Sequence, residues 1–368
     1  MAQTRLHELA EHGQSVWSDF ISREFVRDGD LQKLIDVGVL GATSNPTIFQ
    51  GAIASGDRYD DQIRELVDAG TTDAKDIFWQ LAKDDIRDAC DLFAPVADTT
   101  SGLDGWVSLE VDPNLANDTQ TTASEARRLH DLVDKPNLYI KIPATLAGLD
   151  AIEETIADGI PVNVTLIFSL QRHREVAEAY IRGLERHAEG GGDLTRLNSV
   201  ASFFVSRVDT EADKRLDAIG GHDELKGTLA IANAKLAYQT YKEVFAGERW
   251  EKLAAKGASP QRCLWASTST KNPDYRDVLY VEELIGPDTV NTMPRETIEA
   301  TIDHAKIEDT LERDVEGARK VLEAFKEAGI DYDDVTDTLE REGVEKFAKS
   351  FADLIADVES KRDSLVAA

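Results

Sequence analysis

The chain has 368 residues, 42% of them hydrophobic, and its 41 lysines and arginines against 70 aspartates and glutamates give a formal net charge of −29. The apolar share is enough for a packed core and excludes a disordered chain. The acidic excess argues against nucleic-acid binding, which depends on lysines and arginines that neutralise phosphates. It does not exclude a small phosphorylated ligand in a local basic pocket, because distant charge is screened within about 8 Å at physiological salt.

The composition also excludes several other classes. No apolar run approaches the roughly 18 residues of a membrane span, and the N-terminal MAQTRLHELAEHGQ lacks the apolar core of a secretory signal. We therefore expect a soluble cytoplasmic protein that does not act at membranes. Cys90 and Cys263 form no CxxC pair and are expected to be reduced and buried. The seven histidines show no HExxH spacing and no pair that suits a ligand set, so no histidine metal site is expected.

Short apolar or β-branched segments alternate with long amphipathic helical stretches, which is the pattern of a parallel sheet. The expected strands are 15–20, 38–44, 106–111, 138–143, 162–167, 201–206, 263–268 and 289–294. The glycine-rich EGGGD at 189–193 is expected to end a helix. It does not resemble a phosphate loop, because a helix and not a strand precedes it. Eight such units predict the α/β class and a single (β/α)8 TIM barrel over residues 1–368.

The expected strands, which span about 15–294, are unevenly spaced. Residues 51–105 and 209–261 each hold roughly two helices' worth of chain, so inserted helices are expected there. Residues 295–368 are helical and highly charged, and no obvious linker precedes them. We expect them to pack on the barrel as a C-terminal helical extension.

Lys141 in LYIKIPAT is the most informative residue. Alternation along the strand puts Ile140 and Ile142 on one face and Tyr139 and Lys141 on the other. In a barrel the apolar face meets the helices, so Lys141 is expected inside, near the carboxyl end of the strand. Burial disfavours the charged ammonium and makes a neutral amine available to attack a carbonyl. The alternative is a lysine at the strand rim, exposed or paired with a carboxylate.

Other strands place polar side chains inside at the same end. They are Asp19, Asn45, Ser108, Glu110, Asn163 and Thr165. Asn45 directly follows the second strand, where Pro46 prevents further pairing. Agreement among five strands predicts one polar mouth, where barrel enzymes have their active sites.

Two cations follow later strands: Arg207 in SFFVSRVD and Lys271 in ASTSTKN. On the same mouth both would lie within reach of a phosphate or carboxylate; the alternative for each is ordinary loop charge. Glu110 and Asp112 share a face by alternation and are candidate Mg²⁺ ligands. The lysine on the neighbouring strand argues against the metal, because it already places a positive charge in the mouth.

These motifs resemble the transaldolase family, the Schiff-base enzymes of the pentose phosphate pathway. The matching motifs, in order, are GATSNPTIF, SLEVDP, YIKIPAT, NVTLIFS and SFFVSRVD, and the resemblance runs from SVWSD to about NTMP. It implies a barrel with the reactive lysine on the fourth strand, where Lys141 falls. It also implies transfer of a dihydroxyacetone unit from sedoheptulose 7-phosphate to glyceraldehyde 3-phosphate, giving erythrose 4-phosphate and fructose 6-phosphate. No metal or organic cofactor is then required.

The resemblance also implies catalytic roles. Lys141 would be the Schiff-base nucleophile, and Asp19 the base that takes the C4 hydroxyl proton during carbon–carbon cleavage. Glu110 would relay protons through a water held by Thr165 while the carbinolamine forms and dehydrates.

The implied substrate-binding residues are Asn45, Asn163, Ser202, Phe204, Arg207 and Lys271. The first three would hold substrate hydroxyls, and Arg207 would grip the phosphate. Lys271 stands where the family usually has an arginine, so it keeps the charge but loses the bidentate fork.

Other functions stay open at this point. A related lyase, fructose 6-phosphate aldolase, releases free dihydroxyacetone and tends to carry tyrosine where Phe204 stands, so Phe204 favours the transferase. A barrel that only binds sugar phosphates is a second possibility, and a magnesium-dependent enzyme is a third. The presence of Lys141, Glu110 and Asp19 argues against lost activity. A homodimer is compatible with the motifs, which carry no information on oligomeric state.

Overall fold

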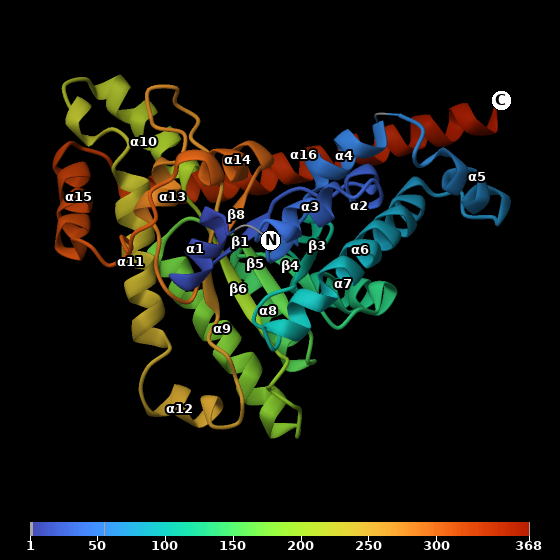
Figure 1. Cartoon of the computed structure of the whole chain (residues 1–368), viewed down its shortest axis with the longest axis horizontal. Helices are drawn as coiled ribbons and strands as arrows, with labels where there is room; N and C mark the ends of the chain where they lie inside the picture. The colour runs from blue at the N-terminus through green and yellow to red at the C-terminus, as the bar shows by residue number, and fades with distance from the viewer. Residues whose placement is uncertain (1–2, 55, 368) are drawn as a thin grey trace.

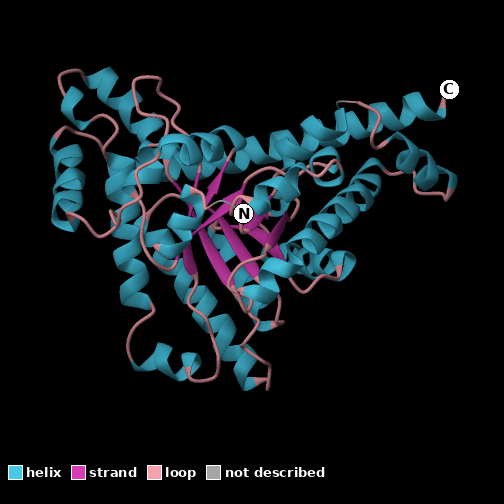
Figure 2. Cartoon of the chain, in the orientation of Figure 1, coloured by secondary structure: helices cyan, strands magenta, loops and turns pink. Residues whose placement is uncertain are grey.

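The computed structural model describes residues 3–54 and 56–367. Its centre is a closed barrel of parallel strands in chain order, and strand β8 pairs with β1 to close it. The strands are β1 (Gln14–Ser18), β2 (Gly41–Thr43), β3 (Val107–Glu110), β4 (Leu138–Pro143), β5 (Val162–Ile167), β6 (Ser199–Phe204), β7 (Arg262–Ala266) and β8 (Thr289–Met293). Figure 2 shows these strands at the centre with helices around them. The predicted (β/α)8 barrel is confirmed.

The helices surround the barrel and fill the long connections. They are α1 (Arg5–Glu11), α2 (Arg23–Arg27), α3 (Asp30–Asp36), α4 (Pro46–Ala54), α5 (Asp60–Asp68), α6 (Ala74–Thr99), α7 (Thr119–Val133), α8 (Leu146–Ala157), α9 (Leu170–Glu189), α10 (Ser206–Ile219), α11 (Leu229–Val244), α12 (Glu248–Ala254), α13 (Leu279–Glu283), α14 (Arg295–His304), α15 (Val315–Glu327) and α16 (Tyr332–Val366), with short 3-10 helices η1 (Pro113–Leu115) and η2 (Asp223–Leu225). The two long connections hold α5 with α6 and α11 with α12, so the predicted insertions are confirmed.

The predicted bounds of β4 and β5 are correct, whereas those of the other six strands are wrong by up to three residues at an end, and β2 and β6 show why. The segment before Gly41 is the turn that ends α3: Gly38 has φ +112°, and the Val39 N–H donates to the Leu34 carbonyl at 3.0 Å. Strand β6 ends two residues earlier than predicted because Ser206 already begins α10. At both positions an adjoining helix fixes the backbone and overrides the strand that the apolar pattern predicts.

Large side chains fill the amino-terminal end of the barrel. The ring of Tyr139 stacks on Trp106 with centroids 4.3 Å apart and lies 6.1 Å from Trp17. Below them, the buried carboxylate of Asp104 accepts hydrogen bonds from Trp17 Nε1 at 3.1 Å and Arg262 Nη2 at 3.0 Å. These side chains therefore pack the interior of the barrel at this end.

The packing around Trp17 predicts a stability effect. A Cβ on Gly41 would lie 2.7 Å from Cε2 of the fully buried Trp17. We expect Gly41→Ala to lower the free energy of unfolding by about 2 kcal/mol, measured by urea denaturation. Gly51→Ala is the control, because a Cβ there meets no atom within 4 Å, and we expect a change below about 1 kcal/mol. Equal stability of Gly41→Ala and wild type would contradict this packing.

The C-terminal extension packs on the barrel, as predicted. Figure 1 shows the long helix α16 running across the molecule past α4 to the C-terminus beyond α5, and α16 packs on α4, α5, α6, α10 and β5. In the described part of the chain, no helix combines the length and apolar character needed to cross a membrane.

Candidate active site

A cavity of about 380 Å³ lies at the carboxyl end of the barrel. Eight of the residues predicted from the sequence line it: Asp19, Asn45, Lys141, Thr165, Ser202, Phe204, Arg207 and Lys271. Glu110 and Asn163 are buried behind the cavity wall. Glu110 bonds Lys141 and Asn163 bonds Ser202, and both of these partners line the cavity. The ends of the parallel strands thus bring together residues far apart in the sequence.

Lys141 lies inside the barrel and is paired with a carboxylate. Strands β3 and β4 place Glu110 directly opposite Lys141, and Lys141 Nζ lies 2.7 Å from Glu110 Oε2 and 3.3 Å from the carbonyl of Ser44. The side chains are only 8% and 3% exposed, respectively. Burial raises the pKa of Glu110, and the charges of Lys141 and Arg207 oppose that rise. The pair can therefore exchange a proton without exposing a bare charge to an apolar surrounding.

Polar side chains of β5 lie beside this pair. Asn163 Oδ1 accepts a hydrogen bond from Ser202 Oγ at 2.7 Å, and its Nδ2 donates to Ser108 Oγ at 3.0 Å. These bonds fix the amide and the Ser202 hydroxyl at the cavity wall. Thr165 Oγ1 is buried and has no hydrogen-bond partner among the described residues. Because Thr165 lines the cavity, its hydroxyl is available to a molecule within it.

Asp19 follows β1 at the cavity wall, where its N–H donates to the Met293 carbonyl at 3.0 Å. Burial is the main cause that raises the pKa of Asp19 to about 6, and the negative charge of Glu296 adds to it. The positive charges of Lys271 and Lys141 act in the opposite direction. A carboxyl group with this pKa changes protonation close to neutral pH, as a general base does.

Cations and aromatic rings also line the cavity. The Arg207 guanidinium lies 5.0 Å from the ring centroid of Phe204 and 6.0 Å from that of Phe347. It forms no hydrogen bond or ion pair with any described residue, and burial lowers its pKa. Lys271 Nζ donates to Ser269 Oγ at 2.7 Å. This side is suited to an anionic group on a ligand.

Asn45 lies at the mouth, where β2 passes into α4. Its Oδ1 accepts a hydrogen bond from the Ile48 N–H at 3.2 Å, a local turn that starts the helix. The same side chain lines the cavity. Its amide group is thereby oriented before any ligand binds.

The shared face proposed for Glu110 and Asp112 does not exist in the structure. Strand β3 ends at Glu110, and Asp112 caps η1 and accepts hydrogen bonds from Asn114 and, at 2.6 Å, from Lys75 Nζ. The two carboxylates therefore face different lysines. In the described ranges, no three His, Cys, Asp or Glu side chains form a group suited to hold a metal ion.

Several residues of the cavity are not predicted from the sequence. Glu296 follows β8 in the first turn of α14 and was detectable by the same rule that found the other strand-end residues. Lys346 and Phe347 come from the middle of α16. No local signal marks them, because an amphipathic helix does not indicate which part of it crosses the barrel mouth.

Comparisons with known proteins agree with this geometry. The family model described as transaldolase/fructose-6-phosphate aldolase matches residues 16–358. A transaldolase of Acidothermus cellulolyticus (strain ATCC 43068 / DSM 8971 / 11B) is 56% identical, with 96% of this chain and 95% of the relative aligned. A transaldolase of Arthrobacter sp. (strain FB24) is 52% identical over 97% of each chain. One of Thermobifida fusca (strain YX) is 52% identical over 95% of this chain and 96% of the relative.

Proposed function

The chain belongs to the transaldolase/fructose-6-phosphate aldolase family, and from this membership we infer that it is a transferase that moves a dihydroxyacetone unit between sugar phosphates. The donor is sedoheptulose 7-phosphate and the acceptor glyceraldehyde 3-phosphate, and the products are erythrose 4-phosphate and fructose 6-phosphate. The observation that carries the assignment of the site is the buried Lys141–Glu110 pair, 2.7 Å apart, beside a cavity that also holds Asp19.

Schiff-base formation begins at this pair. Transfer of the ammonium proton from Lys141 to Glu110 leaves a neutral amine, which attacks the ketone carbon of the donor. A proton passes from the attacking nitrogen to the ketone oxygen to give the carbinolamine. Its hydroxyl then leaves as water with the proton that Glu110 returns, and an iminium remains on Lys141. The unpartnered hydroxyl of Thr165 supports a role in holding the water that passes this proton.

Carbon–carbon cleavage needs a base at the C4 hydroxyl of the substrate. Asp19 would accept the proton of the C4 hydroxyl as the bond between C3 and C4 breaks, and the iminium takes up the electron pair as an enamine. The aldose leaves, and the enamine attacks the acceptor aldehyde by the reverse of these steps. Because burial raises the pKa of Asp19 to about 6, the carboxylate form predominates at neutral pH and can accept a proton.

The remaining residues would bind the substrate. Arg207, which has no acidic partner among the described residues, is suited to the phosphate by its bidentate donors, and Lys271 adds charge at the same mouth. Asn45, Asn163 and Ser202 offer fixed amide and hydroxyl groups to the sugar. Phe204 presents a ring and no hydroxyl at the cavity wall, which supports the transferase over the lyase.

Borohydride trapping with fructose 6-phosphate, followed by peptide mass analysis, tests the mechanism. We expect a reduced dihydroxyacetone adduct on the peptide that contains Lys141. Release of free dihydroxyacetone in the absence of an acceptor should be much slower than transfer to glyceraldehyde 3-phosphate. No adduct in folded protein would contradict the Schiff base, and equal rates with and without the acceptor would identify a lyase.

We propose the cytoplasm as the location of the enzyme. Cys90 and Cys263 are both buried free thiols. Buried free thiols are typical of proteins in a reducing compartment.

A further inference from the structure

The C-terminal helix α16 contributes side chains to the cavity that have no role in the chemistry described above. Lys346 and Phe347 both line the cavity. Phe347 is only 7% exposed, whereas Lys346 is exposed to solvent. Helix α16 is therefore part of the wall around the substrate as well as part of the outer helical layer.

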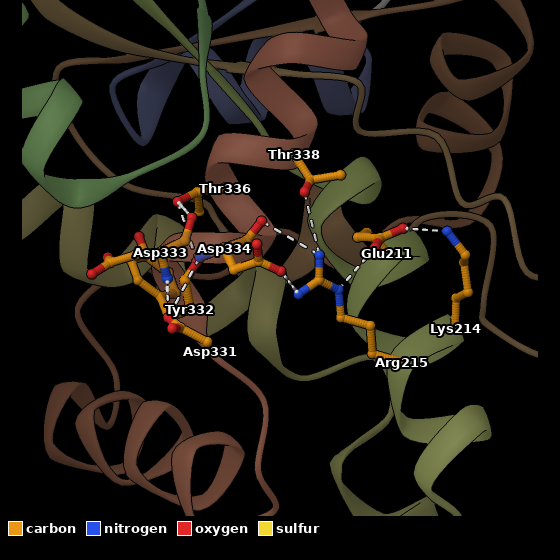
Figure 3. A network of polar contacts seen from close by, with 9 residues as sticks. All are labelled: Glu211, Lys214, Arg215, Asp331, Tyr332, Asp333, Asp334, Thr336 and Thr338. Atoms are coloured by element: carbon orange, nitrogen blue, oxygen red, sulfur yellow. Dashed lines mark hydrogen bonds and ion pairs between the residues drawn. The ribbon is translucent and has the colours of Figure 1, made fainter.

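Polar contacts hold α16 in place over the barrel. Arg215 of α10 donates to Asp334 Oδ2 at 2.6 Å and to Glu211 Oε1 at 2.8 Å (Figure 3). Further along α16, Ser350 Oγ accepts a hydrogen bond at 3.0 Å from Thr47, which also lines the cavity. Anchors on both sides of Lys346 fix the part of the helix that carries it.

Close packing adds to these anchors. Gly343 of α16 sits against Leu166 of β5, so that a Cβ on the glycine would lie 3.0 Å from Leu166 Cδ2. One turn later, the ring centroid of Phe347 lies 5.3 Å from Lys141 Nζ and 6.0 Å from the Arg207 guanidinium. Phe347 thus covers both cations on one side and brings the neighbouring Lys346 to the same opening as Arg207.

The charges around the cavity are not equally available to a ligand. Lys141 is paired with the Glu110 carboxylate at 2.7 Å, whereas Lys271 Nζ donates to the uncharged hydroxyl of Ser269 at 2.7 Å. Arg207, Lys271 and Lys346 form no ion pair with any described residue. They are therefore the cations free to receive the two negative charges of a phosphate group.

We propose that Lys346 is a phosphate-binding residue that supplies a further positive charge beside those of Arg207 and Lys271, so that α16 helps to select phosphorylated substrates. The proposal rests on the proposed function for the identity of the substrate. It places a C-terminal helix residue in direct contact with the phosphate. A lysine suits this position because its flexible stem carries a point charge from the edge of the opening to the ligand.

Acceptor selectivity tests this role. In a ping-pong reaction the kcat/KM of the acceptor is measured independently of the donor. With fructose 6-phosphate as donor, we expect Lys346→Met to lower kcat/KM about tenfold for glyceraldehyde 3-phosphate, through KM, and to leave kcat/KM for unphosphorylated glyceraldehyde unchanged. Lys346→Arg should keep most of the wild-type kcat/KM for glyceraldehyde 3-phosphate.

Lys349→Met is the matched control. Lys349 is exposed on the same helix, pairs with Asp353 at 2.5 Å and does not line the cavity. We expect this variant to have wild-type kinetics, and both variants to have the wild-type melting temperature. No loss with the phosphorylated acceptor, or the same loss with both acceptors, would overturn the role of Lys346.

A binding measurement separates this proposal from the proposed function. Calorimetric titration with inorganic phosphate should show saturable binding to the wild type and the Lys349→Met variant, with a Kd about tenfold higher in Lys346→Met. This readout requires no turnover, so it stands even if the wild type transfers no dihydroxyacetone. Equal phosphate affinity in all three proteins, or no saturable binding to the wild type, would contradict a phosphate site at Lys346.

Discussion

Lys141→Met is expected to lower kcat by at least about 10⁴-fold, the scale of losing a covalent nucleophile. Methionine has a similar length but no amine, so neither carbinolamine nor iminium can form. Borohydride treatment with fructose 6-phosphate should leave the variant at its unmodified mass. Transfer activity is measured by coupled assay after far-UV circular dichroism has verified that the variant is folded.

The same substitution has a consequence for stability. Without Lys141, Glu110 stays buried beside a neutral side chain, and burial then raises its pKa with one opposing charge fewer. The folded state binds a proton that the unfolded state has released, so stability is lost as pH rises above the ordinary range of a glutamate. We therefore expect Lys141→Met to be less stable, relative to wild type, at pH 8 than at pH 5.

Lys235→Met is the matched control for the loss of activity. Lys235 is also buried, on α11, and pairs with a carboxylate, that of Glu283 at 3.5 Å, but it lies outside the cavity. We expect this variant to keep wild-type kcat and adduct formation. Substantial turnover by Lys141→Met, or an adduct on another lysine, would show that the nucleophile has been wrongly assigned.

Alternation along the strands predicts the interior of this barrel well. Lys141 and Glu110 are interior by their period-two pattern alone, and the shared carboxyl ends of parallel strands bring Asp19 and Arg207 to one mouth. The 2.7 Å contact between Lys141 and Glu110 depends on the register of β3 against β4. Register is a tertiary property, and the sequence of either strand alone does not contain it.

The failures have equally physical causes. The alternation of Glu110 and Asp112 predicts a common face, but β3 ends between them and the chain turns into η1. Phe347 lies more than 200 residues from Lys141 in the sequence, and its contact with that amine depends on how α16 crosses the barrel. The anchors that set this crossing, such as Arg215 with Asp334, consist of common surface residue types that do not stand out in a sequence.

Asp19→Asn is expected to lower the rate of donor cleavage about 10³-fold, within the range for loss of a general base. An amide cannot accept the C4 hydroxyl proton, so the bond between C3 and C4 cannot break efficiently. Schiff-base formation should continue, because it depends on Lys141 and Glu110. Borohydride should therefore trap the complete six-carbon ketose phosphate on Lys141, whereas the wild type yields the three-carbon adduct.

The pH dependence of the wild type follows from the same residue. Because the pKa of Asp19 is about 6, kcat/KM for donor cleavage should fall about tenfold per unit as pH decreases below 6, since protonation removes the base. The charge of Glu296 raises this pKa, so Glu296→Gln should move the acidic limb to lower pH while Lys271→Met, which removes a positive charge, should move it to higher pH. Opposite shifts in these two variants would assign the limb to Asp19, and identical profiles in both would assign it to another group. If borohydride trapped no six-carbon adduct on Asp19→Asn, Asp19 would act before cleavage, in the binding of the ketose or the formation of the Schiff base.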